Sequence, residues 1–216
     1  MPEPFGVLRG KAAPLSSDDV DTDQIIPAQF LKVTEKAGLG RYLFYRLRYD
    51  DQGRLTGKFV LDRPEFNGAT FLVAGRNFGI GSSRENAVWA LADKGIRCVV
   101  ADSYGDIFYN NAAKNGILCI RLSGPELASL RERAASGELT LEADLPAQTL
   151  HSGASRIAFE IEPHIKERLI GGMDEIGMTL SEYHGMIIDY ERRAPRFLQH
   201  GPFPTESGLS QNHSDS

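Results

Sequence analysis

The segment ATFLVAGRNFGIGSSRENAVWALADKGIRCVVA (residues 69–101) decides the fold. It begins with an apolar, β-branched run that ends at Gly75, which is typical of a buried strand. A glycine-rich loop follows, and residues 82–94 then have the composition of a helix. Gly95 comes next, and glycine is suited to the left-handed position after a helix. Residues 96–101 are a second apolar run, so the segment predicts a strand, a loop, a helix and a strand.

The same alternation continues toward the C-terminus. Residues 103–116 predict a helix, residues 117–123 a strand, and residues 124–137 another helix with Pro125 in its first turn. After Gly137, the stretches ELTLEADL, QTLHSG and SRIAFEIEP alternate apolar and polar positions, which favours strands, and HIKERLIGG predicts a last helix. Strands and helices at this spacing favour an α/β domain in which helices cover a sheet.

Composition and charge narrow the class of protein. A chain of 216 residues with 41% hydrophobic and 25% charged residues suits a globular domain. The net charge of −5, without a basic block, argues against nucleic acid as a partner. Residues 41–54, RYLFYRLRYDDQGR, mix arginines with aromatics but run into acids, so we expect a solvated or partner-facing surface. No stretch suits a signal peptide or a membrane span, and we expect a cytoplasmic protein without a membrane partner.

The chain has two cysteines, Cys98 and Cys119, each inside or beside a β-like apolar run. They lack a CxxC spacing, so they make neither a disulfide framework nor a complete cluster site. We therefore expect two buried free thiols and no metal site in this chain.

The glycine-rich loop carries the candidate chemistry. Ser82 and Glu85 have the S-x-x-E spacing of a capping box, which predicts Ser82 as the N-cap of the helix. Gly79 and Gly81 let the backbone approach a ligand closely, and the N–H groups of a helix start attract anions. Arg84 can hold a carboxylate through two hydrogen bonds. The spacing fits no dinucleotide, phosphate-loop or serine-hydrolase motif, which leaves a carboxylate or phosphate site and a purely structural loop as alternatives.

Four blocks of sequence, in order, resemble one family. NFGIGSSREN is similar to the NFGxGSSREH signature of the small subunit of 3-isopropylmalate dehydratase, the aconitase-like isomerase of leucine biosynthesis. The other matching blocks are DVDTDQIIPAQFLK (19–32), DSYGDIFYNNAAKNGIL (102–118) and GGMDEIGMTL (171–180). The resemblance implies a swivelling β/β/α fold, and we expect a single domain over residues 1–196. The remaining residues, 197–216, are rich in Pro, Gly, Ser and His and predict a disordered tail.

The resemblance implies an enzyme made of two subunits. In the family, a large subunit holds a four-iron four-sulfur cluster, and the small subunit closes over it. The implied reaction converts 2-isopropylmalate through isopropylmaleate into 3-isopropylmalate, with the open iron as a Lewis acid and a base that takes a proton from carbon. This chain would be a hydro-lyase subunit that binds no cofactor itself and is active only with the large subunit.

Three residues of the loop take roles by their place in the motif. The resemblance implies that Ser82 is the base, acting as an alkoxide. It implies that Ser83 and Arg84 are substrate ligands and that Arg84 also holds Ser82 in its ionised form.

Two further positions are implicated by the resemblance. Thr22 and Asp23 match a Thr-Asp pair that lies close to the active site in the family, and we expect both to take part in substrate binding. The alternative for Asp21 and Asp23 is a turn with a helix cap. Asn86 stands where the signature has histidine and cannot titrate near neutral pH. We expect it behind the substrate ligands, and it leaves another small hydroxy-diacid, such as citramalate, malate or dimethylmalate, as an alternative substrate.

Overall fold

The computed structural model describes residues 2–15, 17–31, 36–82, 84–172, 186 and 189–190. The chain divides into two units, Met1–Glu175 and Ile176–Ser216, and the fold described here is that of the first. Most of the matching block GGMDEIGMTL, the expected domain boundary at residue 196 and the expected tail of residues 197–216 lie outside the described residues.

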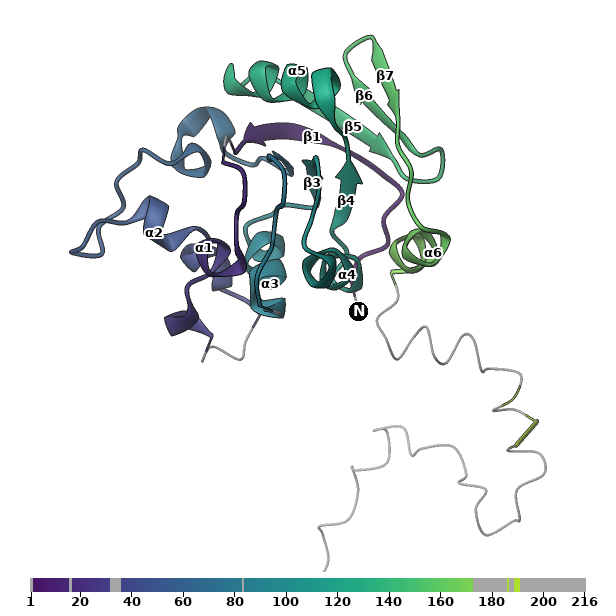
Figure 1. Ribbon diagram of the computed structural model, residues 1–216, viewed down its shortest axis with the longest axis horizontal. Coiled ribbons are helices and arrows are strands. Elements are labelled where there is room, and N and C mark those ends of the chain that lie inside the picture. The colour runs from purple at the N-terminus through teal and green to yellow at the C-terminus, as the bar shows by residue number, and fades with distance from the viewer. Residues whose placement is uncertain are drawn as a thin grey trace, which may run out of the picture. The chain divides into compact units, whose positions relative to one another are not determined.

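One seven-stranded sheet forms the centre of the first unit (Figure 1). Its strands are β1 (Val7–Pro14), β2 (Phe71–Val73), β3 (Cys98–Ala101), β4 (Leu118–Arg121), β5 (Thr140–Asp144), β6 (Thr149–Ser152) and β7 (Ser155–Ala158). The spatial order is β4-β3-β2-β1-β5-β6-β7, with β1 to β4 parallel and β5 to β7 antiparallel to their neighbours. β1 belongs to both halves, because residues 12–14 pair with β2 and residues 7–11 pair with β5.

Helices connect the parallel strands to one another, join β4 to β5 and follow β7. They are α1 (Thr22–Ile25), α2 (Tyr45–Arg48), α3 (Glu85–Asp93), α4 (Asp106–Lys114), α5 (Gly124–Ala135) and α6 (Pro163–Gly171), with short 3-10 turns η1 (Ala28–Phe30), η2 (Leu39–Tyr42), η3 (Val60–Asp62) and η4 (Pro64–Phe66). α3 packs against α4, and α5 packs on β1 and β2. Every residue of β2 and β3 is buried, as expected for strands covered on both faces. The predicted α/β class and the order of its strands and helices are confirmed.

Residues 41–54 differ in part from their prediction, because Leu43, Phe44 and Arg48 are buried. Arg46 is 63% exposed, in line with a solvated or partner-facing surface, but Arg48 is buried, so the prediction is wrong there. The Arg48 Nε lies 2.9 Å from both carboxylate oxygens of Asp62, and its Nη1 donates to the carbonyl oxygens of Gly40, Arg41 and Leu43 at 3.0–3.2 Å. A guanidinium group has five donors, and this one holds the irregular segment 40–43 beside Asp62.

The two cysteines are buried free thiols, as expected. Cys98 lies in β3 and Cys119 in β4, and burial raises the pKa of both thiols well above the usual value. A protonated, inaccessible thiol is a poor nucleophile and a poor metal ligand. Over the described part of the chain, no helix is long and apolar enough to cross a membrane.

Candidate active site

Three loops meet at the carboxyl edge of the parallel strands. The loop after β1 leads to α1, the loop after β2 leads to α3, and the loop after β3 leads to α4. Isolated backbone bridges join Asp21 to Ile80 and Phe78 to Tyr104, so the three loops pair side by side beyond the sheet. The carboxyl edge is where open α/β sheets bind their ligands.

The glycines of the second loop have different roles. Gly79 has a φ of +75°, and a Cβ atom at this position would lie 2.3 Å from the Phe108 ring. Its N–H donates to the carbonyl oxygen of Val20 at 2.7 Å. Gly81 has a φ of +97°, a conformation that glycine adopts without strain. Gly79 therefore allows the loop to pack on α4, while Gly81 turns the chain toward Ser82.

Arg84 and Asp23 form the charged centre of the candidate site. The Arg84 Nη1 donates to the Asp23 Oδ1 at 2.6 Å and to the Ile26 carbonyl oxygen at 3.4 Å. The hydrogen bond from Arg84 is the main reason why the pKa of the Asp23 carboxyl lies below its usual value, and the charge of Arg46 adds to it. Arg46 Nη1 lies 2.8 Å from the Asp23 Oδ2. One carboxylate thus joins two arginines.

Thr22 fixes the backbone at Ser82. Thr22 is 3% exposed, its N–H donates to the Ile80 carbonyl oxygen at 2.9 Å, and its Oγ1 donates to the Ser82 carbonyl oxygen at 3.0 Å. The neighbouring Asp21 caps α1, accepting a hydrogen bond from the N–H of Gln24 at 2.7 Å. Asp21 is therefore the helix cap that the sequence allowed, whereas Asp23 points to Arg84.

The predicted capping box is wrong. α3 begins at Glu85, and its N-cap is Arg84, which has an extended backbone (φ −131°, ψ 95°) and makes no side-chain cap hydrogen bond. Arg84 is extended at the point where its side chain reaches Asp23 in α1, and the helix starts two residues later than the S-x-x-E spacing implies. Ser82 consequently lies two residues before the N-cap and is exposed.

The other candidate residues are placed as follows. Asn86 is the second residue of α3 and is half-buried. Ser83 lies outside the described residues. Arg46 has a direct contact with the site that the sequence reasoning missed. No local pattern could have found it, because its partner Asp23 lies on a distant segment of the chain.

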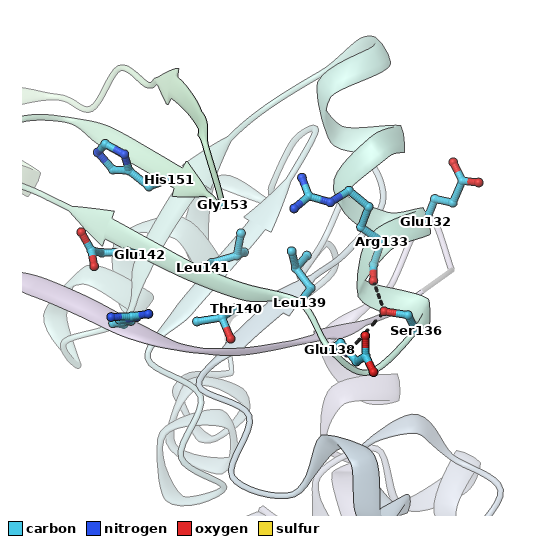
Figure 2. A pocket seen from close by; sticks show the side chains of 11 residues that line it. Glu132, Arg133, Ser136, Glu138, Leu139, Thr140, Leu141, Glu142, His151 and Gly153 are labelled. Carbon is cyan, nitrogen blue, oxygen red and sulfur yellow. Dashed lines mark hydrogen bonds between the residues drawn. The ribbon is translucent and has the colours of Figure 1, made fainter.

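An open groove lies away from these loops (Figure 2). Its volume is about 1000 Å³, and it lies between the C-terminal end of α5 and strands β1, β5 and β6. Its lining mixes charges of both signs, including Arg9, Arg133, Glu142 and His151. None of the candidate site residues lines this groove, so its volume says nothing about the chemistry at the carboxyl edge.

Comparisons with known proteins agree with this architecture. The model of the Aconitase C-terminal domain matches residues 3–125. The chain is 49% identical over 193 residues to a 3-isopropylmalate dehydratase small subunit from Phenylobacterium zucineum, covering 89% of this chain and 95% of the relative. A protein of the same name from Lactococcus lactis is 46% identical over 191 residues, 88% of this chain and 98% of that protein.

A solved structure extends the comparison to three dimensions. The crystal structure of a 3-isopropylmalate dehydratase from Methanocaldococcus jannaschii is similar with a TM-score of 0.62 at 25% identity, over 85% of this chain and 99% of that one. The fold is thus that of an aconitase C-terminal domain. Within this class, the chain belongs to the 3-isopropylmalate dehydratase small-subunit family. The family and the fold class expected from the sequence are both confirmed.

Proposed function

We propose that the chain is the small subunit of a heteromeric isopropylmalate isomerase, a hydro-lyase that interconverts 2-isopropylmalate and 3-isopropylmalate through isopropylmaleate in leucine biosynthesis. The observation that carries the proposal is the similarity, over nearly the full length, to relatives named as small subunits of this dehydratase. Their names also favour isopropylmalate over the other hydroxy-diacids that Asn86 had left open.

The iron–sulfur cluster of the reaction is assigned to the large subunit. Iron–sulfur clusters are held by cysteine thiolates, and the only two cysteines of this chain are buried in neighbouring strands with raised pKa values. Among the described residues, no group of three or more His, Cys, Asp and Glu side chains could hold a metal ion. The residues of this chain therefore do not fit the cluster, and the steps below concern only what this chain contributes.

Ser82 is proposed as the base. Its side chain is exposed and is not the helix cap, and its backbone is fixed by Thr22. The proposed step moves the proton from the substrate carbon to the Ser82 alkoxide, and the C–H electron pair forms the double bond as the neighbouring C–O bond breaks. The cluster of the large subunit would supply the Lewis acid that accepts the leaving hydroxide. A serine hydroxyl has a very high pKa, so the alkoxide needs a positive potential in a closed site. Arg84, on the same loop as Ser82, and Arg46, in α2, supply positive charge at Asp23.

Arg84 is proposed as the ligand of a substrate carboxylate. Asp23 holds its guanidinium through Nη1, which orients the group before substrate arrives. The proposed site also contains Ser83 as a second substrate ligand. Thr22 and Asp23 hold the ligands in place, and Asn86 lies behind them.

Purified alone, the chain is expected to be colourless, to bind no iron and to show no dehydratase activity. Mixed with its cluster-bearing large subunit, it should restore isomerisation of 2-isopropylmalate, as measured by the absorbance of isopropylmaleate and by product analysis. Citramalate, malate and dimethylmalate are assayed in parallel. A brown, active single chain would disprove the two-subunit model, and a reconstituted pair that used only another diacid would disprove the substrate.

Arg84→Lys is expected to raise KM and to lower kcat, reducing kcat/KM by about 10- to 100-fold. This range corresponds to the loss of one hydrogen bond to a charged group, about 1.5–3 kcal/mol, because an ammonium group cannot replace a two-bond fork. Arg76→Lys is the matched control, since Arg76 lies in the same loop but pairs with Asp18 and Asp19 at its exposed side. Unchanged kinetics for Arg84→Lys would remove Arg84 from the site.

A further inference from the structure

We propose that Arg46 is a positioning residue for substrate binding, which shares Asp23 with Arg84 and thereby keeps a net positive charge at the substrate-carboxylate site. The inference rests on the proposed function, because it assumes that Arg84 receives a substrate carboxylate. It adds a residue that the signature motifs do not contain.

The geometry places the two arginines on opposite oxygens of one carboxylate. Arg84 Nη1 donates to Asp23 Oδ1 at 2.6 Å, and Arg46 Nη1 lies 2.8 Å from Asp23 Oδ2. The Asp23 Oδ1 also accepts the N–H of Ala28 at 3.0 Å, which fixes the orientation of the carboxylate. Asp23 is thus held from three sides and cannot turn to serve one arginine alone.

The charges of the three groups decide what an arriving anion meets. Asp23 and Arg84 by themselves form a neutral pair, which attracts a carboxylate weakly at a distance. With Arg46 the set carries one net positive charge. The substrate is a dianion, and a single charge at several ångströms in a partly exposed site changes binding by about fivefold if the effective dielectric constant is between those of the protein surface and of water.

Arg46 is held by a rigid part of the chain and not by a loose surface loop. It is the second residue of α2, and α2 packs against α1, which contains Asp23. The preceding Tyr45 stacks on Tyr49 with ring centroids 4.4 Å apart and contacts Phe30 at 4.8 Å. The buried Arg48 anchors the other face of the same turn. Arg46 is therefore presented to Asp23 by packing that does not depend on Arg46 itself.

The exposure of Arg46 separates a role in binding from a role in stability. Its side chain is 63% exposed, and exposed ion pairs contribute little to the stability of a fold. Removal of Arg46 should therefore leave folding intact, so a change in KM reports on the site.

The test compares Arg46→Gln, Arg46→Lys and the control Arg54→Gln in the reconstituted enzyme. Arg54 is 71% exposed and pairs with Asp50. The Arg54→Gln substitution therefore removes the same charge from the same segment without affecting a contact of Asp23. Arg46→Gln should raise KM for isopropylmalate about fivefold at low salt with kcat within about twofold of wild type. The rise should shrink at high salt because ions screen exposed charges. Arg46→Lys should restore most of the affinity, and Arg54→Gln should change nothing.

A second measurement needs no activity. In the isolated chain, Arg46→Gln should raise the pKa of the Asp23 carboxyl, while Arg54→Gln should not. The pKa is measured by titrating the ¹³C chemical shift of the Asp23 carboxyl carbon. If the wild-type pair lacks isomerase activity, the proposed function fails, and a rise in the Asp23 pKa would still support the shared carboxylate. If the wild-type pair is active but Arg46→Gln leaves KM unchanged, lowers only kcat or matches Arg54→Gln, the role of Arg46 is disproved.

Discussion

Ser82→Ala is expected to lower kcat of the reconstituted enzyme by about a thousandfold, within the range that a positioned base contributes. Because α3 begins at Glu85 and its N-cap is Arg84, the Ser82 side chain is not the cap of the helix. The loop backbone is held by Thr22 through the Ser82 carbonyl group, which alanine retains. Complex formation with the large subunit and the melting temperature should therefore be those of wild type.

Ser123→Ala is the matched control for this variant. Ser123 is also exposed and lies directly before a helix, and as the N-cap of α5 it makes no side-chain cap hydrogen bond. It should leave kcat, KM and stability unchanged. Near-normal turnover of Ser82→Ala would show that the base is another group. Loss of the complex would show instead that Ser82 acts in the subunit interface.

Asp62→Leu is expected to destabilise the chain by about 3–5 kcal/mol, because it leaves the charge of Arg48 buried without its partner. The side chains of Arg48 and Asp62 are only 6% and 3% exposed. For a domain of this size the loss corresponds to a fall in melting temperature of roughly 10 °C, measurable by calorimetry or by circular dichroism.

The double variant Arg48→Met with Asp62→Leu separates charge from packing. Replacing both partners of a buried pair by apolar residues is often nearly neutral, so the double variant should recover most of the loss. Asp50→Leu is the exposed control: it removes the surface pair with Arg54 and two hydrogen bonds from backbone N–H groups of the turn, and should cost less than about 2 kcal/mol. If Asp62→Leu and Asp50→Leu had equal effects, Arg48 would have to find another counter-charge or water. If the double variant were no more stable than Asp62→Leu, the carbonyl contacts of Arg48 would be the main contribution.

The regular part of the fold could be predicted because its signals are local. The run from β2 to α5 alternates apolar strands with helices ended by Gly95, Gly116 and Gly137, and each of these glycines has a positive φ in the structure. The β5–β7 meander was visible as alternating apolar and polar positions. Such patterns depend on periodicity within a few residues, and no contact between distant segments is needed to read them.

The errors arise where a distant contact decides the local structure. The S-x-x-E spacing of Ser82 and Glu85 locally favours a capping box, but Arg84 is extended where it meets Asp23 in α1, and the helix begins later. Arg48 looked like a surface arginine until the fold brought Asp62 beside it. The contact of Arg46 with Asp23 could not be predicted for the same reason.

The candidate site shows the same division. The motif positions indicated Thr22, Asp23, Ser82 and Arg84, and the structure brings α1 and the loop before α3 together at one edge of the sheet. What the sequence could not give was the sharing of Asp23 between two arginines, since it depends on how the segment after α1 folds back.

Because β1 pairs with both β2 and β5, insertions and deletions within this strand are poorly tolerated. Its register is fixed on one side by β5 and on the other by β2, and the chain then runs directly to Thr22 and Asp23. An added or deleted residue within β1 would displace one end of the strand by about 3.3 Å and turn its side chains to the opposite face. A shift of that size exceeds the length of the hydrogen bond between Asp23 and Arg84. Insertions and deletions are thus far better accommodated in the β6–β7 turn than in β1. The length of β1 sets the distance between the antiparallel half of the sheet and the loops of the proposed site.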